Sequence, residues 1–368
     1  MGTINSLLKF KGVPTIQERL KGPITKLVLW TDIHFGARSN SDQHNLDCLE
    51  YIDWLIERCK EEKPSHIAFL GDFFENRNAI NVRTLNHASD ACRRLNALNI
   101  PIIFIIGNHD LYHRSNRKVY STNMFDDLEN FVVISEPTEI DKDWFVSPFL
   151  FRDEYPNMVD SINSHKYVLG HFEFRNFVVT GATRTLDHGP DGAMFTGPKF
   201  IFSGHFHKRQ HNQNIVYIGN TFPSNYGDAG DAERGCAVLD VSTDDVYFHN
   251  WDQAPLFFKT KLSEILAGSV ETEWPAKSRV RCLLDADIGY SDVQALREEM
   301  IKMYDLREFS VEEDIQARKE MLSEGLDLET ELDMSSLDNT VRQLINEGVQ
   351  ASPTIDPQVL VQLYEELV

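Results

Sequence analysis

Short apolar runs and longer stretches of helical periodicity alternate over the first hundred residues. The runs at 26–30, 66–70 and 102–106 are apolar at most positions, which is typical of strands buried on both faces of a sheet. Between them, residues 45–60 and 82–98 carry apolar side chains at helical spacing. The pattern predicts a β-α-β-α-β unit, as in an α/β protein with a largely parallel sheet.

The pattern changes after residue 130, where helical stretches become scarce. Short strands follow one another with turn residues between them, and they predict a second sheet packed on the first. These strands cover residues 131–134, 144–146, 167–169, 200–203, 215–218 and 236–239. The expected fold class is therefore α/β, with two packed mixed β-sheets flanked by helices.

The last third of the chain has a different organisation. Strand-like runs at 256–261 and 280–284, a helical stretch at 292–303 and a returning strand at 309–312 predict a small α+β domain. An acidic, weakly periodic stretch follows, and then two apolar stripes that predict short helices. We divide the chain into an N-terminal extension (1–24), a core (25–254), the small domain (255–316), a linker (317–334) and a C-terminal helical element (335–368).

The formal net charge of −21 argues against a surface that coats nucleic acid on all sides. The charge is uneven, because residues 293–368 hold 18 acidic and 6 basic side chains. The 5 cysteines are scattered and odd in number, which is typical of reduced thiols in the cytoplasm. No apolar run approaches the ~18 residues of a membrane span, and residues 1–21 lack a signal-peptide core. We expect a cytoplasmic protein that does not bind a membrane.

Candidate metal ligands follow five of the apolar runs. Two adjacent divalent metals that hydrolyse a phosphoester need carboxylate, imidazole and amide donors of this kind. A single histidine after a strand is more often a surface or core residue than a metal ligand. The five segments together nevertheless predict a two-metal site. They are Asp32-Ile33-His34, Gly71-Asp72, Gly107-Asn108-His109-Asp110, Gly170-His171 and Gly204-His205-Phe206-His207.

Asp72 is the candidate bridge between the two metals, because a shared carboxylate keeps two adjacent positive charges together. Asp32 and His34 are expected at the first metal, and Asn108 and His171 at the second. His205 and His207 would each complete one of them, and their spacing leaves open which takes which. The mixed oxygen and nitrogen donors suit manganese, iron or zinc.

His109 is expected to have a different role, because it stands beside a ligand and near the expected phosphate. It can protonate the leaving oxygen or stabilise the charge that develops on the phosphate. We expect Asp110 to orient His109 through a hydrogen bond.

The motifs resemble those of the calcineurin-like metallophosphoesterase family, over residues 26 to about 240. Within the family they are most similar to the SbcD / Mre-eleven type nuclease subunits of double-strand-break repair, including the recombination endonuclease subunit of large tailed phages. The segments that carry the resemblance are residues 31–34, 71–74, 107–110, 204–207, 217–226 and 233–235.

The resemblance implies a metal-dependent DNA exonuclease or endonuclease that processes double-strand breaks during recombination and repair. It implies two divalent metals, most often Mn²⁺ with Mg²⁺ as the second choice, and a small capping domain. The family's ligand positions fall on the seven candidates above and its catalytic histidine on His109. One departure is Glu75, where many relatives have a histidine. A carboxylate there would repel a phosphate unless it is turned away or bound to an arginine such as Arg77.

The resemblance also implies partners. Relatives work with an SMC-like ATPase of the SbcC type that binds C-terminal helices, and they dimerise through core helices. The expected location is then the bacterial host cytoplasm. Basic residues near the motifs are candidates for DNA contact, although each can also be solvated loop charge. They are Arg38, Arg77, Arg114, Arg117, Lys118, Lys208 and Arg209.

A second function remains open on the same core. The chain could be a small-molecule phosphodiesterase or a phosphoprotein phosphatase, which the acidic net charge favours. The residues beyond the core and the two apolar stripes at the end of the chain favour the nuclease with a protein partner.

Overall fold

A computed structural model describes residues 15–180, 184–268, 274–286 and 288–313. The first of its two large sheets has six strands in the order β14-β13-β1-β2-β3-β4. The strands β1 to β4 run parallel, and β13 pairs antiparallel with both β1 and β14. Their bounds are β1 Lys26–Trp30, β2 His66–Phe69, β3 Ile102–Ile105, β4 Phe131–Ile134, β13 Gly235–Asp240 and β14 Asp245–Asn250.

The second sheet also has six strands, in the order β11-β12-β10-β7-β6-β5. Its central strands β6, β7, β10 and β12 are parallel, and the outer strands β5 and β11 pair antiparallel. Their bounds are β5 Thr138–Glu139, β6 Trp144–Ser147, β7 Tyr167–Gly170, β10 Phe200–Ser203, β11 Gln210–Asn212 and β12 Ile215–Tyr217. Helix α5 (Tyr155–Asn163) lies between β6 and β7 in the chain.

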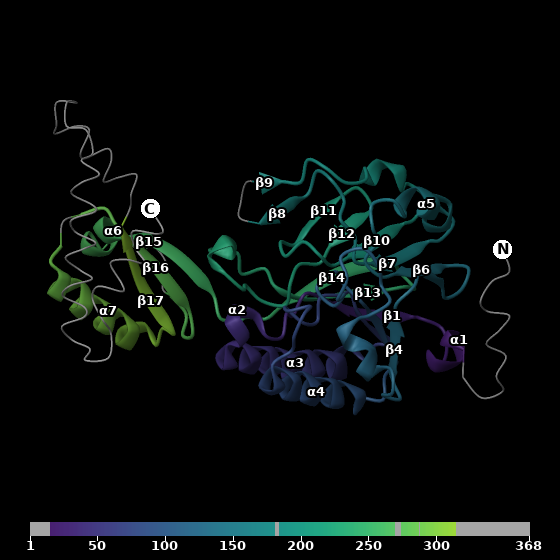
Figure 1. The fold of residues 1–368 in the computed structure, drawn as a ribbon, viewed down its shortest axis with the longest axis horizontal. Coiled ribbons are helices and arrows are strands. Elements are labelled where there is room, and N and C mark those ends of the chain that lie inside the picture. The colour runs from purple at the N-terminus through teal and green to yellow at the C-terminus, as the bar shows by residue number, and fades with distance from the viewer. Residues whose placement is uncertain (1–14, 181–183, 269–273, 287, 314–368) are drawn as a thin grey trace, which may run out of the picture. The chain divides into compact units, whose positions relative to one another are not determined.

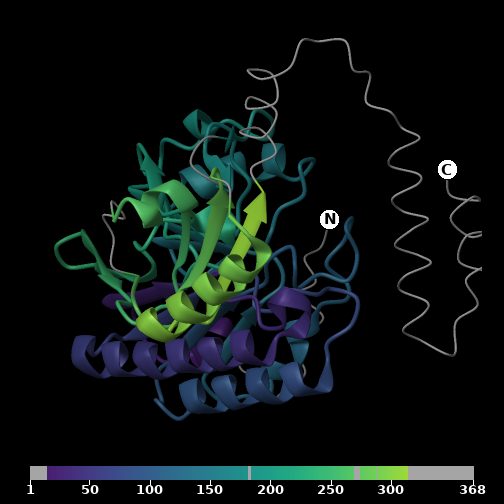
Figure 2. The same cartoon turned by 90° about the vertical axis from the view of Figure 1, so that its left-hand side faces the viewer.

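Two long helices cover the outer face of the first sheet. They are α3 (Asp42–Glu62) and α4 (Val82–Asn96), which lie side by side in both ribbon views (Figures 1 and 2). Each begins at a polar cap, since the side chains of Ser41 and Asn81 accept hydrogen bonds from the first turn. Helix α3 ends where Lys63 takes a left-handed backbone conformation, just before a proline.

Both faces of the first sheet are buried, and alternate side chains of β1 pack on opposite faces. Val28 and Trp30 pack in the cluster that joins the sheet to α3 and α4, whereas Leu27 and Leu29 pack in the cluster between the two sheets. A third cluster covers the outer face of the second sheet with Tyr155 and Ile162 of α5. The site described below is therefore built on strands that are fixed on both sides.

A small α+β unit follows the two sheets. It has three strands in the order β15-β16-β17, which are β15 Phe257–Lys261, β16 Arg279–Leu284 and β17 Glu308–Glu313, together with helices α6 (Leu262–Leu266) and α7 (Tyr290–Tyr304). The remaining elements are short: α1 Ile16–Arg19, α2 Ala37–Asn40, η2 Ser121–Phe125, β8 Val178–Thr180, β9 Arg184–Thr185, η3 Gly192–Met194 and η4 Tyr226–Asp228.

The predicted fold class is confirmed, with two exceptions in sheet membership. We expected residues 131–134 and 236–239 in the second sheet, but they form β4 and β13 of the first, where they pair with β3 and β1. The sequence pattern also missed α5 and β14. Along β14 the side chains are exposed or half-buried, so the strand lacks an apolar signature.

The structure bears on the N-terminal boundary that we expected, but not on the linker or the C-terminal element. Leu20 and Ile24, which we placed in an N-terminal extension, are buried in the cluster between the sheets. The linker and the C-terminal helical element lie outside the described residues. None of the helices in the described ranges is both long enough and apolar enough to cross a membrane.

Candidate metal centre

The candidate ligands lie where strands of both sheets end. Parallel strands bring their carboxyl ends to the same edge, so residues far apart in the chain meet there. Four of these residues have a left-handed backbone, namely Asp32 (φ 51°), His34 (φ 52°), Asp72 (φ 60°) and His205 (φ 89°). This conformation is uncommon for residues other than glycine and is typical of positions where function constrains the backbone.

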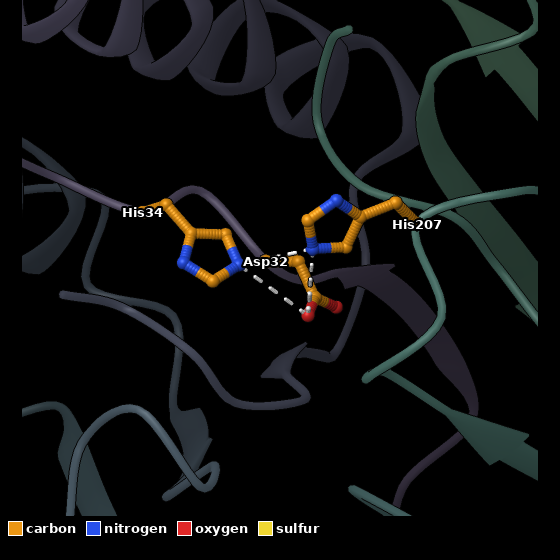
Figure 3. A group of neighbouring side chains, drawn as sticks. All are labelled: Asp32, His34 and His207. Atoms are coloured by element: carbon orange, nitrogen blue, oxygen red, sulfur yellow. Dashed lines mark hydrogen bonds and ion pairs between the residues drawn. The ribbon is translucent and has the colours of Figure 1, made fainter. Parts of the chain in front are cut away.

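Asp32, His34 and His207 form the first group of donors (Figure 3). The two imidazoles point toward the Asp32 carboxylate, with His34 Nε2 at 3.8 Å and His207 Nε2 at 4.0 Å from its Oδ1. The two Nε2 atoms are 3.2 Å apart. The other carboxylate oxygen of Asp32 accepts a hydrogen bond of 2.6 Å from the Thr31 hydroxyl, which fixes the carboxylate in place.

A second group surrounds the Asn108 amide oxygen. His171 Nε2 lies 3.0 Å from this oxygen and His205 Nδ1 lies 2.9 Å from it. Asp72, His171 and His205 also offer ligand atoms within 4.8 Å of one another. The structure thus places His207 with the first group and His205 with the second, which the spacing of the two histidines had left open.

Asp72 stands between the two groups. Its Oδ2 atom is 3.4 Å from His171 Nε2 and 3.8 Å from His34 Nε2, so it reaches both. Its Oδ1 atom accepts the main-chain N–H of His109 at 2.8 Å. Gly107 allows this approach, because a Cβ atom there would lie 2.1 Å from Oδ1. A single carboxylate oxygen therefore faces both sets of imidazoles.

The carboxylates and imidazoles shift one another's protonation. Burial would raise the pKa of the Asp72 carboxyl, but the nearby imidazoles, His171 first, lower it well below its usual range. Burial disfavours a proton on His171, yet the Asp72 carboxylate raises the pKa of that imidazole to about 9. Burial and the neighbouring His171 lower the pKa of His205 to about 3. The site therefore combines the negative charge of Asp72 with a neutral imidazole, His205, whose unprotonated ring nitrogen has a lone pair that can bind a metal.

This donor set fits divalent cations. It contains carboxylate and amide oxygens and four imidazoles, and a structural zinc site would more often use thiolates. The cysteines in the described residues are all buried and none belongs to these clusters. The seven candidates are thus together at one place, in two groups with a shared carboxylate.

The expected hydrogen bond between Asp110 and His109 is wrong. The Asp110 carboxylate is buried and accepts main-chain N–H groups of Asp72, Phe73, Phe74 and Gly107 at 2.9–3.1 Å. Both of its oxygens are used in this way, so it ties the loop after β2 to the loop after β3. His109 Nδ1 donates instead to the main-chain oxygen of Glu75 at 2.7 Å.

Glu75 also has a partner that we did not expect. Its carboxylate lies 2.9 Å from His34 Nδ1, and this contact lowers the pKa of Glu75 to about 2. We had considered Arg77 as the group that would hold a carboxylate at this position. The role of Thr31 was missed as well. Thr31 has no sequence signal beyond its place next to Asp32, and Glu75 stood out only as a departure from the resemblance, with no sign of its partner.

Two of the basic candidates already bind other residues of this chain. The Arg117 guanidinium is bound by both carboxylate oxygens of Glu154 at 2.6 Å, and its side chain is only 8% exposed. Arg209 donates to Asn250 at 2.7 Å and lies over the ring of Phe248. We therefore remove both from the set of residues proposed to bind DNA.

The other basic candidates are more accessible. Arg38 is exposed, although it also pairs with Glu308 of β17 at 3.3 Å. Arg114 and Lys118 are exposed on the loop that follows His109, and Arg77 and Lys208 are half-buried beside the two loops that carry ligands.

Comparisons with known proteins agree with this geometry. The family model described as calcineurin-like phosphoesterase matches residues 25–209, just over half of the chain. "Exonuclease subunit 1" of Enterobacteria phage T4 is 26% identical over 229 residues, which are 61% of this chain and 67% of that protein.

Two solved structures show a weaker likeness. A dimetal phosphatase from Danio rerio has a TM-score of 0.39 at 8% identity, over 60% of this chain and 93% of that one. The Pseudomonas putida nuclease MPE has a TM-score of 0.29 at 14% identity, over 60% and 87%. The match of the family model over the segment that holds both donor groups identifies this chain as a member of the calcineurin-like phosphoesterase family, and so as a metal-dependent phosphoesterase.

Proposed function

We propose that this protein is a two-metal-dependent DNA nuclease that works as a subunit of a recombination and double-strand-break-processing complex. The observation that carries the two-metal part is the position of Asp72, whose Oδ2 atom lies within 3.8 Å of imidazoles from both donor groups. A carboxylate in this place can hold two cations close together, as phosphodiester cleavage by two metals requires.

The proposed ligands divide as the structure groups them. Asp32, His34 and His207 would hold one metal, and Asn108, His171 and His205 the other, with Asp72 shared. When bound, the metals polarise the phosphodiester and lower the pKa of a water nucleophile. We propose Mn²⁺ ahead of Mg²⁺, because four of the seven donors are imidazoles and Mg²⁺ prefers oxygen.

His109 is the proposed proton donor to the leaving oxygen. Its Nδ1–H is already donated to the Glu75 carbonyl, so Nε2 is the atom that can exchange a proton with substrate. The ring stands edge-on to His34 with 5.0 Å between centroids, which places it beside the first donor group. Its main-chain N–H also donates to Oδ1 of Asp72, the proposed bridging carboxylate, so His109 is tied directly to that residue.

The loop after His109 is the proposed contact with DNA. Its base is fixed, because Leu111 is buried and Arg117 is bound to Glu154. Between these anchors Arg114 is exposed, and Tyr112 is 50% exposed. A cation beside an open aromatic ring suits a strand of nucleic acid, since phosphate attracts the cation and an unpaired base can stack on the ring.

The DNA substrate and the complex rest on the relative. The T4 protein is named an exonuclease and a subunit, and this chain covers 67% of it. We propose an SMC-like ATPase of the SbcC type as the partner, bound through residues 335–368, which lie outside the described residues. A homodimer through α3 and α4 is part of the same proposal.

A substrate comparison tests the function. The metal-free protein is loaded with Mn²⁺, and its rates are measured on a single-stranded oligonucleotide, on bis(p-nitrophenyl) phosphate and on a phosphopeptide. We expect the highest kcat/KM on the oligonucleotide, and a further increase with the ATPase and ATP. Cleavage of the small diester or the phosphopeptide with no cleavage of DNA would instead support a small-molecule phosphodiesterase or a phosphoprotein phosphatase.

A further inference from the structure

Glu75 touches two imidazoles of the site through different atoms. Its carboxylate Oε2 lies 2.9 Å from His34 Nδ1, and its main-chain oxygen accepts the Nδ1–H of His109 at 2.7 Å. The main-chain N–H of Glu75 donates to the carbonyl of Phe35 at 3.0 Å. Glu75, which lies on the loop after β2, is therefore held to the loops that follow β1 and β3.

These contacts decide which ring nitrogen faces the site. A carbonyl oxygen can only accept, so His109 carries its hydrogen on Nδ1. For His34 the contact is an ion pair and not an aligned hydrogen bond, because its Nδ1 has no hydrogen-bond partner among the described residues, but the carboxylate charge 2.9 Å away still favours the hydrogen on that nitrogen. The Nε2 atom of His34 then faces the site, where it lies 3.2 Å from His207 Nε2 and 3.8 Å from Oδ1 of Asp32. The same reasoning leaves Nε2 of His109 free to face a substrate.

The short distance to a carboxylate sets His34 apart, since on the far nitrogen of His205 the Glu173 carboxylate is 4.0 Å away. His171 is oriented by a neutral group, since its Nδ1 donates to the Leu70 carbonyl at 2.7 Å. A carboxylate partner makes the bound imidazole a stronger electron donor than a carbonyl does, and loss of such a partner typically costs about 10–100-fold in metal affinity. The Glu75 side chain is 42% exposed, so no need to fill the core accounts for its placement.

We propose that Glu75 is a positioning residue that holds His34 through its carboxylate and His109 through its main-chain oxygen, so that both rings present Nε2 to the site. This inference rests on the metal-dependent function proposed above. The effects of Glu75 on His34 and on His109 can be separated. A change of its side chain removes the partner of His34 but leaves the main-chain carbonyl that holds His109.

The test measures metal binding on the metal-free full-length protein by calorimetric titration with Mn²⁺. We expect Glu75→Ala to weaken one of the two sites by about 10–100-fold and to leave the other unchanged. Anomalous scattering from crystals at limiting Mn²⁺ should show the loss at Asp32, His34 and His207. Glu75→Gln should recover only part of the affinity, because an amide oxygen can keep the contact with His34 Nδ1 but lacks the charge of the carboxylate. The rate at saturating Mn²⁺ should change less than the affinity.

Glu129→Ala is the matched control, since this carboxylate is 78% exposed and pairs only with Lys21 among the contacts described for it. Two results would overturn the inference. One is wild-type affinity at both sites in Glu75→Ala. The other is an equal loss at both sites together with a lower melting temperature of the metal-free protein, which would make Glu75 a general structural residue. The titration uses no DNA, so a protein that binds Mn²⁺ normally but cleaves no DNA would contradict the proposed function alone.

Discussion

The substitution Arg117→Met distinguishes a structural role of this arginine from a role in DNA binding. The residue lies in the loop after the candidate proton donor, and its sequence position suggested contact with DNA. In the structure its guanidinium donates to both oxygens of Glu154, and also to the carbonyl of Phe149 at 3.1 Å. It lies over the ring of Phe151 as well, at 5.3 Å from the centroid. We expect the substitution to lower stability and to leave DNA affinity unchanged.

The magnitude follows from the contacts that are lost. Hydrogen bonds to a charged group contribute about 1.5–3 kcal/mol each, and breaking a fully buried pair costs about 3–5 kcal/mol. The Glu154 side chain is 30% exposed and keeps a hydrogen bond of 2.8 Å from the Phe151 N–H, so water and this bond offset part of the loss. Methionine retains the apolar stem of the side chain. We expect the free energy of unfolding to fall by about 2–4 kcal/mol.

The assay is urea denaturation of the metal-free protein, because bound metal would add its own stabilisation. A double-mutant cycle with Glu154→Gln should give a coupling energy of at least about 1 kcal/mol. Arg114→Met is the control, and it should keep its stability but lower the salt dependence of DNA binding by about one unit of slope. If Arg117→Met kept wild-type stability and bound DNA more weakly, the structural reasoning would be refuted.

Three further outcomes are expected. His109→Ala should reduce DNA cleavage by about 10²–10⁴-fold with both metals still bound, and loss of a metal in its crystal would make His109 a ligand instead. Asp72→Asn should weaken both metals in a calorimetric titration, because a neutral amide cannot offset two adjacent dications; one site at wild-type affinity would exclude Asp72 as the bridge. Deletion of residues 335–368 should leave metal-dependent cleavage of short single-stranded DNA and abolish capture of the ATPase, and equal capture by the truncated and full-length proteins would exclude that role.

Local patterns in the sequence were sufficient for the strands that carry the candidate ligands. A buried parallel strand is apolar along its length, and the polar residue that ends it is conspicuous, as at Trp30 and Asp32. Because parallel strands share an edge, placing the ligands together needed no knowledge of the loops. The assignment of the two GHFH imidazoles did need the loop geometry, since the turn at His205 (φ 89°) directs the two rings to different groups.

Long-range pairing explains most of what the sequence did not predict. Strand β13 lies more than 200 residues from its partner β1, and nothing local distinguishes it from the strands of the second sheet. The role of Asp110 depends on four N–H groups from two loops, which no spacing rule encodes. Arg117 and Glu154 are 37 residues apart, so the ion pair that occupies this arginine could not be expected from either segment alone.

The left-handed backbone at four candidate ligands has an evolutionary consequence. Each such residue costs on the order of 1–3 kcal/mol of stability, least for aspartate and most for the two histidines, and selection for catalysis must maintain that cost. A duplicated copy of this gene released from that selection would gain stability by exchanging His34 or His205 for glycine or asparagine. Glycine or asparagine at these two positions in a related sequence would therefore mark a lineage that has kept the scaffold and abandoned the reaction.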